Sequence, residues 1–274
     1  MENNLKFSVL MSVYAKDNPA FFKEALDSVI NQTRQPDEIV IVEDGIVPEE
    51  IKQILSEYKD KFDFIKSVVL EKNCGLGIAL QKGLEQCSFN IVARMDSDDI
   101  SLPDRFKKQI KCFENDKDLS VLGGYIEEID AQSLKTLSRR TVPLTDIEIK
   151  KRIKSRAPFN HVTVMFKKDV ILKAGGYRNL YCFEDYDLWA RIAVENLKMQ
   201  NLSGVLVLVR INENLYKRRG GWKYFKSNKA VQDELFKLGV ISFPLYCVNV
   251  IVRFTVQVLM PSFARSLFYK IFLR

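Results

Sequence analysis

Paired cysteine motifs and an N-terminal export signal are both absent from this sequence. Its five cysteines are scattered, and no CxxC pair occurs among Cys74, Cys87, Cys112, Cys182 and Cys247. Neither a zinc site nor a disulfide framework is therefore indicated, and scattered single cysteines are typical of a reducing cytosol. The first residues lack the basic segment, apolar core and cleavage site of a signal peptide, so we expect none.

Acidic residues are scarce in the C-terminal quarter of the chain. From Arg210 to Arg274 there are twelve Lys or Arg and three Asp or Glu, whereas the preceding 209 residues hold thirty and thirty-two. The net charge of +7 therefore belongs to the C-terminal region. Such asymmetry indicates a polyanionic partner, either nucleic acid or an anionic membrane.

The first half of the chain alternates between strand and helix patterns. Its 274 residues suffice for one large α/β domain, or for a domain with an appendage. Repeated β-α units with short connections predict an α/β fold with a mainly parallel sheet and helices on both faces. Strands are expected at 7–13, 38–42, 65–70, 90–95 and 119–123, and helices at 19–30, 48–58, 75–87 and 103–113. Beyond residue 125 we expect strands at 162–166 and 202–209, and helices at 185–194 and 222–238.

Three carboxylates cluster where the strand at 90–95 ends. Asp96, Asp98 and Asp99 fall within four positions. Such a cluster is costly unless water or a cation neutralises it, and magnesium takes one or two carboxylates together with substrate phosphates. The alternative is a solvated acidic turn before a helix, because Asp and Ser are ordinary turn residues.

Polar signatures also follow the three preceding strands. They are Ser12-Val13-Tyr14, Glu43-Asp44-Gly45 and Lys72-Asn73-Cys74-Gly75. Each one alone is compatible with a common turn or helix cap. In a parallel sheet, however, the carboxyl ends of the strands converge on one crevice. The crevice would then contain an aromatic side chain, a carboxylate, an Asn and an acidic turn. This combination predicts a pocket that binds a nucleoside diphosphate.

Taken in order, these motifs resemble a known family. Ser8–Tyr14, the Glu-Asp-Gly turn, Asn73-x-Gly-Leu, the Asp-x-Asp-Asp cluster and the later Glu184-Asp185 pair look like family 2 glycosyltransferases of the GT-A fold. The resemblance covers roughly residues 6–215. It is greatest to bacterial non-processive members that build O-antigen, capsule and exopolysaccharide units on a lipid diphosphate carrier. A Gln-x-x-Arg-Trp motif is missing, which disfavours a processive synthase.

The resemblance implies a role for each strand-end residue. Val13 and Tyr14 would line the nucleotide base, and Asp44 and Asn73 would form hydrogen bonds with it. Asp96 and Asp98 would form the DXD motif of the family. Asp96 would then lie toward the ribose or phosphates, and Asp98 would bind a divalent metal, Mn²⁺ or Mg²⁺. Asp99 would orient the site or touch the donor sugar, while Arg94 would balance the acidic turn or contact the donor.

The Glu184-Asp185 pair precedes the helix expected at 185–194. Acidic residues are favoured at helix N-termini, which by itself would explain the pair. Sugar transfer, however, needs a base to take the proton of the acceptor hydroxyl, and a carboxylate within reach can do so. By resemblance Asp185 is the base of a single inverting displacement, and Glu184 supports it. His161, the single histidine, is either structural or part of the acceptor side.

The C-terminal region predicts two amphipathic helices, at 244–260 and 262–274. In the first, Asn249, Arg253 and Gln257 recur every fourth residue, so one face is polar. Because a charge at mid-span is expensive in a bilayer, we expect these helices to lie on a membrane rather than cross it. The alternative is a helical pair packed on the protein's own core.

We therefore expect a catalytic domain at 1–215 and a basic helical region at 216–274. Residues 1–125 would form the nucleotide-sugar-binding half and 126–215 the acceptor-side half. By resemblance, a hexose or N-acetylhexosamine would pass from a nucleotide sugar, UDP-linked, to a polyprenyl diphosphate-linked saccharide. The protein would be cytoplasmic and peripheral on the inner face of the cell membrane.

Two competing functions fit the sequence less well. A nucleotidyltransferase would have a glycine- and basic-rich stretch after the first strand, whereas Ser12–Asn18 offers one Lys and no Gly. A nucleic-acid-binding protein would expose aromatic residues among basic ones, whereas those of the tail fall mostly on apolar helix faces. We expect no nucleic-acid partner.

Overall fold

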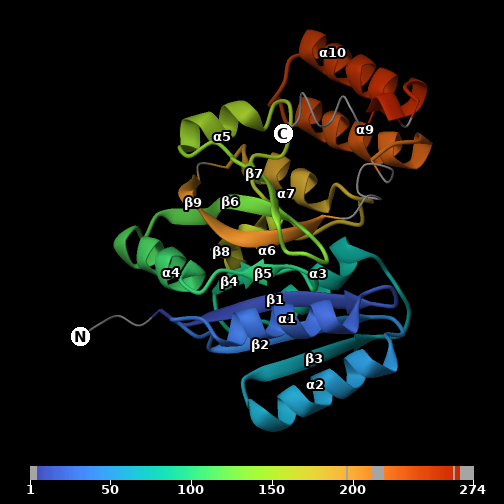
Figure 1. Cartoon of the computed structure of the whole chain (residues 1–274). Coiled ribbons are helices and arrows are strands. Elements are labelled where there is room, and N and C mark those ends of the chain that lie inside the picture. Colours follow the sequence, from blue (N-terminus) through green and yellow to red (C-terminus); the bar gives the residue numbers. More distant parts are fainter. Residues whose placement is uncertain (1–4, 196, 212–218, 262, 266–274) are drawn as a thin grey trace.

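One twisted sheet organises the part of the chain that the computed structural model describes, residues 5–195, 197–211, 219–261 and 263–265 (Figure 1). Its nine described strands run in the order β3-β2-β1-β4-β8-β6-β9-β5, with β7 paired to β6. The strands are β1 (Phe7–Tyr14), β2 (Glu38–Asp44), β3 (Ile65–Leu70), β4 (Ile91–Arg94), β5 (Ile100–Ser101), β6 (Leu119–Asp130), β7 (Thr136–Arg140), β8 (Met165–Lys167) and β9 (Lys198–Ile211).

Strands β3, β2, β1 and β4 are parallel neighbours, as the sequence predicts. The register pairs Tyr14 with Asp44 and Asp44 with Leu70, so the carboxyl ends of these strands lie side by side. Strand β8 is antiparallel to both β4 and β6, while β9 is parallel to β6. The result is a mixed α/β fold whose polar strand ends converge on one edge of the sheet.

Helices cover both faces of the sheet, and each face has its own apolar core. The helices are α1 (Pro19–Ile30), α2 (Glu49–Lys61), α3 (Leu76–Gln86), α4 (Arg105–Asn115), α5 (Asp146–Arg152), α6 (Lys168–Lys173), α7 (Glu184–Ile192), α9 (Trp222–Lys237) and α10 (Phe243–Phe254). Val9 and Met11 of β1 pack with residues of α1, α2 and α4. Leu10, between them, packs on the opposite face with residues of α3, α7 and α9, because successive strand residues point to opposite sides.

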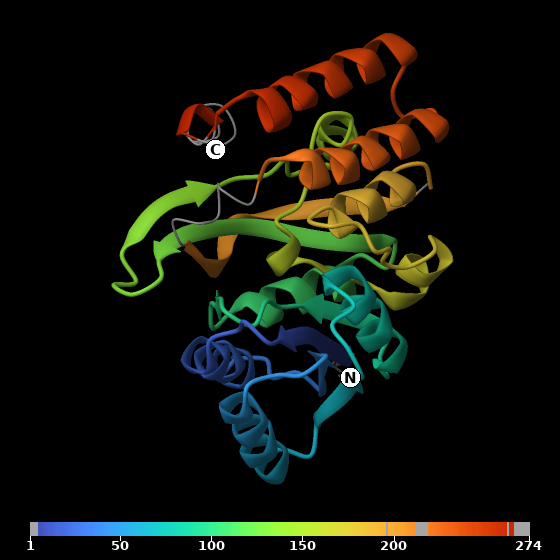
Figure 2. The ribbon, with the colours of Figure 1, turned by 90° about the vertical axis from the view of Figure 1, so that its right-hand side faces the viewer.

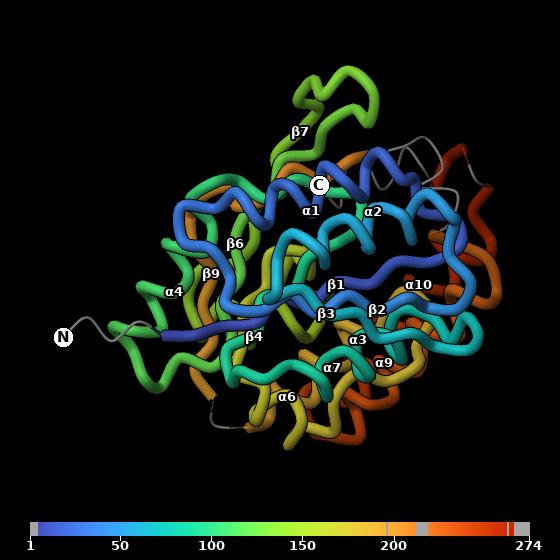
Figure 3. The backbone as a smooth tube through the Cα atoms, turned by 90° about the horizontal axis from the view of Figure 1, so that it is seen from below, coloured from blue at the N-terminus to red at the C-terminus, as the bar shows by residue number. Residues whose placement is uncertain are grey.

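The second half of the chain differs from the sequence prediction, which did not include β7, α5 and α6. The strand expected at 162–166 is a 3-10 turn, η1 (His161–Thr163), followed by β8. Thr163 stabilises the turn, since its hydroxyl donates to the carbonyl of Asn160 at 2.7 Å and its backbone N–H to the same carbonyl at 2.8 Å. Strands β6 and β9 are longer than predicted and pair along their length, and the β6–β7 hairpin projects from the body (Figure 3).

A helix that lies on a membrane would turn its polar face toward water, but the polar face of α10 is turned toward the protein. Asn249 donates to the carbonyl of Lys154 at 2.9 Å and to the Gln232 side chain at 3.0 Å. Arg253 donates to the Asn228 side chain at 2.9 Å. The polar face therefore packs against the protein, because polar groups of α9 and of the turn after α5 need partners there. Helix α10 is the outermost helix of the molecule (Figure 2). Its apolar residues Val248, Ile251 and Val252 are exposed, so its apolar face points outward.

The C-terminal helices complete the described chain. Helix α10 continues into a π-helical turn, η2 (Thr255–Leu259), and most of the helix expected at 262–274 lies outside the described residues. Within the described ranges, none of the helices combines the length and apolar character needed to cross a bilayer.

A buried arginine, Arg105 in α4, joins the sheet to the loop that carries the three carboxylates. Its guanidinium donates to the carbonyl of Arg94 at 2.7 Å, to the Met95 sulfur at 3.2 Å and to the Gln109 side chain at 3.1 Å. Gln109 in turn donates to the carbonyl of Thr163 at 2.8 Å. Burial lowers the pKa of Arg105 to about 9. One cation thus fixes the end of β4 against α4 and η1.

We predict that Arg105→Ala destabilises the protein by at least about 2 kcal/mol, because it leaves a cavity and strands the Arg94 carbonyl and the Gln109 side chain. Urea denaturation followed by far-UV circular dichroism measures the change. Lys108→Ala, at an exposed position of the same helix, is the matched control and should change stability by less than about 0.5 kcal/mol. Equal stability of the two variants would contradict the role given to Arg105.

Candidate active site

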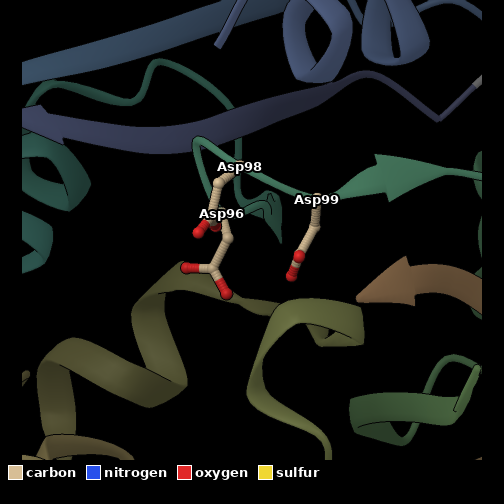
Figure 4. Close-up of side chains that lie close together, drawn as sticks. All are labelled: Asp96, Asp98 and Asp99. Atoms are coloured by element: carbon tan, nitrogen blue, oxygen red, sulfur yellow. The ribbon is translucent and has the colours of Figure 1, made fainter. Parts of the chain in front are cut away.

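The three carboxylates predicted as a cluster converge in the structure. Carboxylate oxygens of Asp96, Asp98 and Asp99 lie within 4.8 Å of one another (Figure 4). Asp98 is exposed, Asp96 half-buried and Asp99 buried. Desolvation of its carboxylate by the surrounding protein, together with the charges of Asp96 and Asp17, raises the pKa of Asp98 to about 6. Burial and the charges of Asp96 and Asp98 raise that of Asp99 well above its ordinary value. A divalent cation would relieve this repulsion, and carboxylate oxygens are suitable ligands for it.

Two residues that the sequence analysis missed hold this acidic loop. Arg210 in β9 donates its backbone N–H to the Asp99 carboxylate at 2.9 Å and its guanidinium to the carbonyl of Asp98 at 2.6 Å. Asp17 accepts from the Ser97 hydroxyl at 2.8 Å and from the backbone N–H of Tyr14 at 3.1 Å. Both partners are distant in sequence from the loop, so no local motif signals them. The sequence left the role of Asp99 open, and in the structure its carboxylate accepts the hydrogen bond from Arg210 that holds the loop to β9.

Asp44 organises the loop expected to meet a nucleotide base. Its buried carboxylate accepts from the Asn73 side chain at 3.0 Å and from the backbone N–H groups of Cys74 at 2.7 Å and Gly75 at 3.0 Å. A carboxylate offers about four lone-pair positions, so Asp44 retains capacity for one further donor. Gly45 permits this packing. Its φ is +83°, and a Cβ on it would lie 2.5 Å from the backbone nitrogen of Asn73.

The two residues predicted to line the base lie at the end of β1 but differ in exposure. The Val13 side chain is fully buried in the core, so only its main-chain atoms remain to meet a base. Tyr14, the last residue of β1, is half-buried beside Asp44 of β2.

Arg94 links the acidic cluster to the Glu184-Asp185 pair. Its guanidinium is 3% exposed and forms an ion pair with Asp96. Burial opposes its charge, but Asp96, Tyr177 and Glu184 raise its pKa above the ordinary value. The positive charge of Arg94 in turn acts on both Glu184 and Asp185. Arg94 therefore balances the acidic turn from the position where the two halves of the site meet.

Glu184 and Asp185 begin α7 on the far side of Arg94. Burial and the charge of Asp185 raise the pKa of Glu184 to about 8, and burial also raises the pKa of Asp185. A raised pKa makes a carboxylate a better proton acceptor, which suits a general base. Helix α3 packs closely against the segment that precedes α7, since a Cβ on Gly77 would lie 2.2 Å from the carbonyl of Arg178. A position in the first turn of a helix does not by itself explain why Glu184 is buried, because most carboxylates at such positions remain in contact with water.

His161 contacts aromatic residues and is near enough to Arg94 to be affected by its charge. Its Nε2 is 2.9 Å from the Tyr177 hydroxyl, and its ring packs against Tyr177 and Trp189. Burial and the charge of Arg94 hold the pKa of His161 well below 6.5, so the imidazole is neutral at pH 7. A neutral, packed imidazole favours the structural alternative of the sequence analysis.

The sequence of the chain matches the family described as glycosyl transferase family 2 over residues 8–174. The chain belongs to this family. It is therefore a glycosyltransferase, as the order of its motifs predicts.

Two relatives extend the match beyond residue 174, one of them to nearly the whole chain. The chain is 38% identical over 269 residues to the UDP-Gal:alpha-D-GlcNAc-diphosphoundecaprenol beta-1,3-galactosyltransferase of Escherichia coli, covering 98% of this chain and 97% of that protein. It is 41% identical to the amylovoran biosynthesis glycosyltransferase AmsE of Erwinia amylovora, covering 81% of this chain and 82% of that protein. Both belong to the biosynthetic class that the sequence motifs indicate.

A solved structure shows the fold. TarS of Staphylococcus aureus, residues 1–349 in complex with UDP-GlcNAc, aligns with a TM-score of 0.69 at 18% identity. The alignment covers 98% of this chain and 76% of that one. The expected GT-A fold of the glycosyltransferase is thereby confirmed.

The raised pKa of Glu184 predicts a pH-dependent effect of Glu184→Gln on stability. With a folded-state pKa near 8 and an ordinary value of 4.5, the native state binds more protons between these limits, so stability falls as pH rises. The variant lacks this penalty. We expect it to match the wild type at pH 5 and to exceed it by more than roughly 1 kcal/mol at pH 8. Urea denaturation in EDTA measures this, and a pH-independent difference would contradict it.

Proposed function

We propose that the protein transfers a hexose or N-acetylhexosamine from a UDP-sugar to a saccharide linked through diphosphate to a polyprenol. The observation that carries the proposal is the convergence of three elements in one site. They are the Asp44–Asn73 loop, the carboxylates of Asp96 and Asp98, and the Glu184-Asp185 pair behind Arg94. The E. coli relative, whose name specifies UDP-galactose and a GlcNAc-diphosphoundecaprenol, supports this choice of donor and acceptor.

The geometry supports a division of labour among the residues. Asp44 and Asn73, with Tyr14 and the main chain of Val13, would hold the base. Asp98 would bind Mn²⁺ or Mg²⁺, Asp96 would face the ribose and phosphates, and Asp99 would keep the loop in place through β9. A divalent metal held by Asp98 would neutralise the charge that develops on the departing nucleoside diphosphate.

Asp185 would act as the general base of a single displacement. It takes the proton of the acceptor hydroxyl as that oxygen attacks the anomeric carbon, and the bond from this carbon to the diphosphate breaks on the opposite face. The configuration at the anomeric carbon is inverted. Glu184, protonated at neutral pH, would orient the acceptor by a hydrogen bond. Of the pair, Glu184 is buried and Asp185 is half-buried, so Asp185 stays open to the acceptor hydroxyl.

Substitutions of Asp98 and Asp185 separate binding from chemistry. Asp98→Ala should lose metal-dependent binding of the UDP-sugar and reduce transfer by 10²-fold or more, a magnitude typical of a lost electrostatic contact. Asp185→Asn should retain donor binding but reduce transfer by about 10²- to 10⁴-fold. Calorimetry and transfer to a synthetic GlcNAc diphosphate lipid measure the two effects. Unchanged transfer by Asp185→Asn would remove it as the base, and no turnover of any UDP-sugar by the wild type would refute the proposed function.

We propose further that the enzyme works on the anionic inner face of the cell membrane, with the outer face of α10 against the lipid. This face comprises Val248, Ile251 and Val252, and Leu259 of η2 continues it; each of the four is at least 50% exposed. Its polar opposite side is already occupied by the protein. The adjoining α9 has exposed Lys223 and Lys226, while its acidic residues Asp233 and Glu234 are paired with Lys229 and Arg178. Apolar area and surplus positive charge both favour an anionic bilayer.

A charge placed on this face should reduce binding to lipid. We expect Ile251→Glu to weaken sedimentation with phosphatidylglycerol vesicles by roughly tenfold or more, because burial of an Ile side chain contributes about 1.5–3 kcal/mol. Ile147→Glu is the matched control, since Ile147 is 81% exposed on α5, away from this face. Equal vesicle binding by both variants would contradict the docking surface.

A further inference from the structure

A cluster of arginines lies between the outer helices and Asp185, and none of the roles above uses it. It consists of Arg140 at the end of β7, Arg152 and Arg156 beside the turn after α5, and Arg253 in α10; we call it the arginine cluster. Arg219, just before α9, faces Arg140. The elements that carry the cluster gather in the upper part of Figure 1.

Hydrogen bonds show how these elements converge. The guanidinium of Arg253 donates to the carbonyl of Ser155 at 2.5 Å, which holds α10 against the turn between Arg152 and Arg156. From the opposite side, the hydroxyl of Tyr186, the residue after Asp185, donates to the carbonyl of Ile153 at 2.7 Å. The turn is therefore held between α10 and the first turn of α7. Its two arginines, Arg152 and Arg156, therefore lie on a segment that is hydrogen-bonded to the residue next to the proposed base.

The charges of the cluster act on one another and on the catalytic pair. Burial and the charge of Arg219 lower the pKa of Arg140. Burial and the charges of Arg152, Arg140 and Arg253 lower that of Arg156 to about 10. Arg140 also stabilises the ionised form of Asp185. Besides Asp185, Glu128 is the other carboxylate that favours the charge of Arg140.

The cluster is therefore a concentration of positive charge that an anion would stabilise. Like charges held together at partial burial destabilise the protein unless a counter-charge is present. Arg152 also has a buried Nε without a hydrogen-bond partner. Arginine guanidinium groups match phosphate oxygens in planar, bidentate geometry, which lysines and amides do not.

We propose that the arginine cluster binds the diphosphate of the lipid-linked acceptor and so places the acceptor sugar at Asp185. This inference rests on the proposed function, because it takes the acceptor chemistry from there. An acceptor with one sugar on its diphosphate has its phosphates one ring away from the attacking hydroxyl. The diphosphate site must then border the base, as Arg140 borders Asp185. The polyprenyl chain beyond the diphosphate would continue toward α10 and its apolar outer face.

The test compares two soluble acceptors on the intact chain. One is GlcNAc α-linked to an alkyl diphosphate, and the other is the same sugar α-linked to an alkyl alcohol without phosphate. The quantity measured is the ratio of kcat/KM for the first acceptor to that for the second, with a saturating UDP-sugar and Mn²⁺. Any effect on folding, donor binding or the base changes both values alike and cancels in the ratio.

We expect Arg140→Gln and Arg156→Gln each to lower this ratio on the order of tenfold or more, mainly through KM, because each removes a hydrogen bond to a charged group. Arg139→Gln is the matched control, since Arg139 is the neighbouring arginine on β7 and pairs with Glu127 instead. High salt should lower the ratio of the wild type more than that of the Arg140 variant.

Three outcomes would overturn the inference. The ratio may be the same in the wild type and in both cluster variants, or it may fall equally in the control. Alternatively, the variants may lose binding to phosphatidylglycerol vesicles at an unchanged ratio, which would assign the arginines to lipid headgroups. Failure of the proposed function is distinguishable from these, because then the wild type transfers sugar to neither acceptor.

Discussion

The repulsion among Asp96, Asp98 and Asp99 is the constraint on which the site depends. Burial, together with the charges of neighbouring carboxylates, raises the pKa values of Asp98 and Asp99, whose oxygens lie within 4.8 Å of one another and of those of Asp96, so the loop needs opposing contacts to keep its shape. Arg94 supplies an ion pair from the side of the sheet, and the backbone and guanidinium of Arg210 supply hydrogen bonds from β9. The protein thus prepares a cluster of oxygens before a cation arrives, and the cation completes the balance of charge.

The buried cations also connect the two halves of the enzyme. Arg105 holds the carbonyl at the end of β4 and, through Gln109, the carbonyl of Thr163 in the acceptor-side half. Arg94 acts on Asp96 in one direction and on Glu184 and Asp185 in the other. The acidic cluster and the Glu184-Asp185 pair are therefore electrostatically linked through Arg94. In the proposed mechanism, a change of charge beside Asp96 would alter the proton affinity of Asp185 without any movement of the chain.

The C-terminal helices extend the same pattern outward. Helix α10 uses its polar residues to pack on α9 and on the turn after α5, which leaves an apolar outer face. Behind it come the arginine cluster and then Asp185. The order from outside to inside is apolar surface, positive charge and the carboxylate that we propose as the base. A lipid-linked diphosphate sugar has the same order of chemical groups along its length.

The sequence by itself determined the parallel first half of the sheet, the family and the convergence of the strand-end motifs. These features follow from local patterns, since apolar runs, turn residues and parallel connections fix where strand ends meet. Only the tertiary structure showed Asp17 and Arg210 on the acidic loop, the neutral packing of His161 and the inward polar face of α10. Periodicity reveals that a helix has two faces, but not which one the protein covers. That choice depends on carbonyl and amide groups far away in sequence, such as those of Lys154 and Gln232, which need hydrogen-bond partners once the chain has folded.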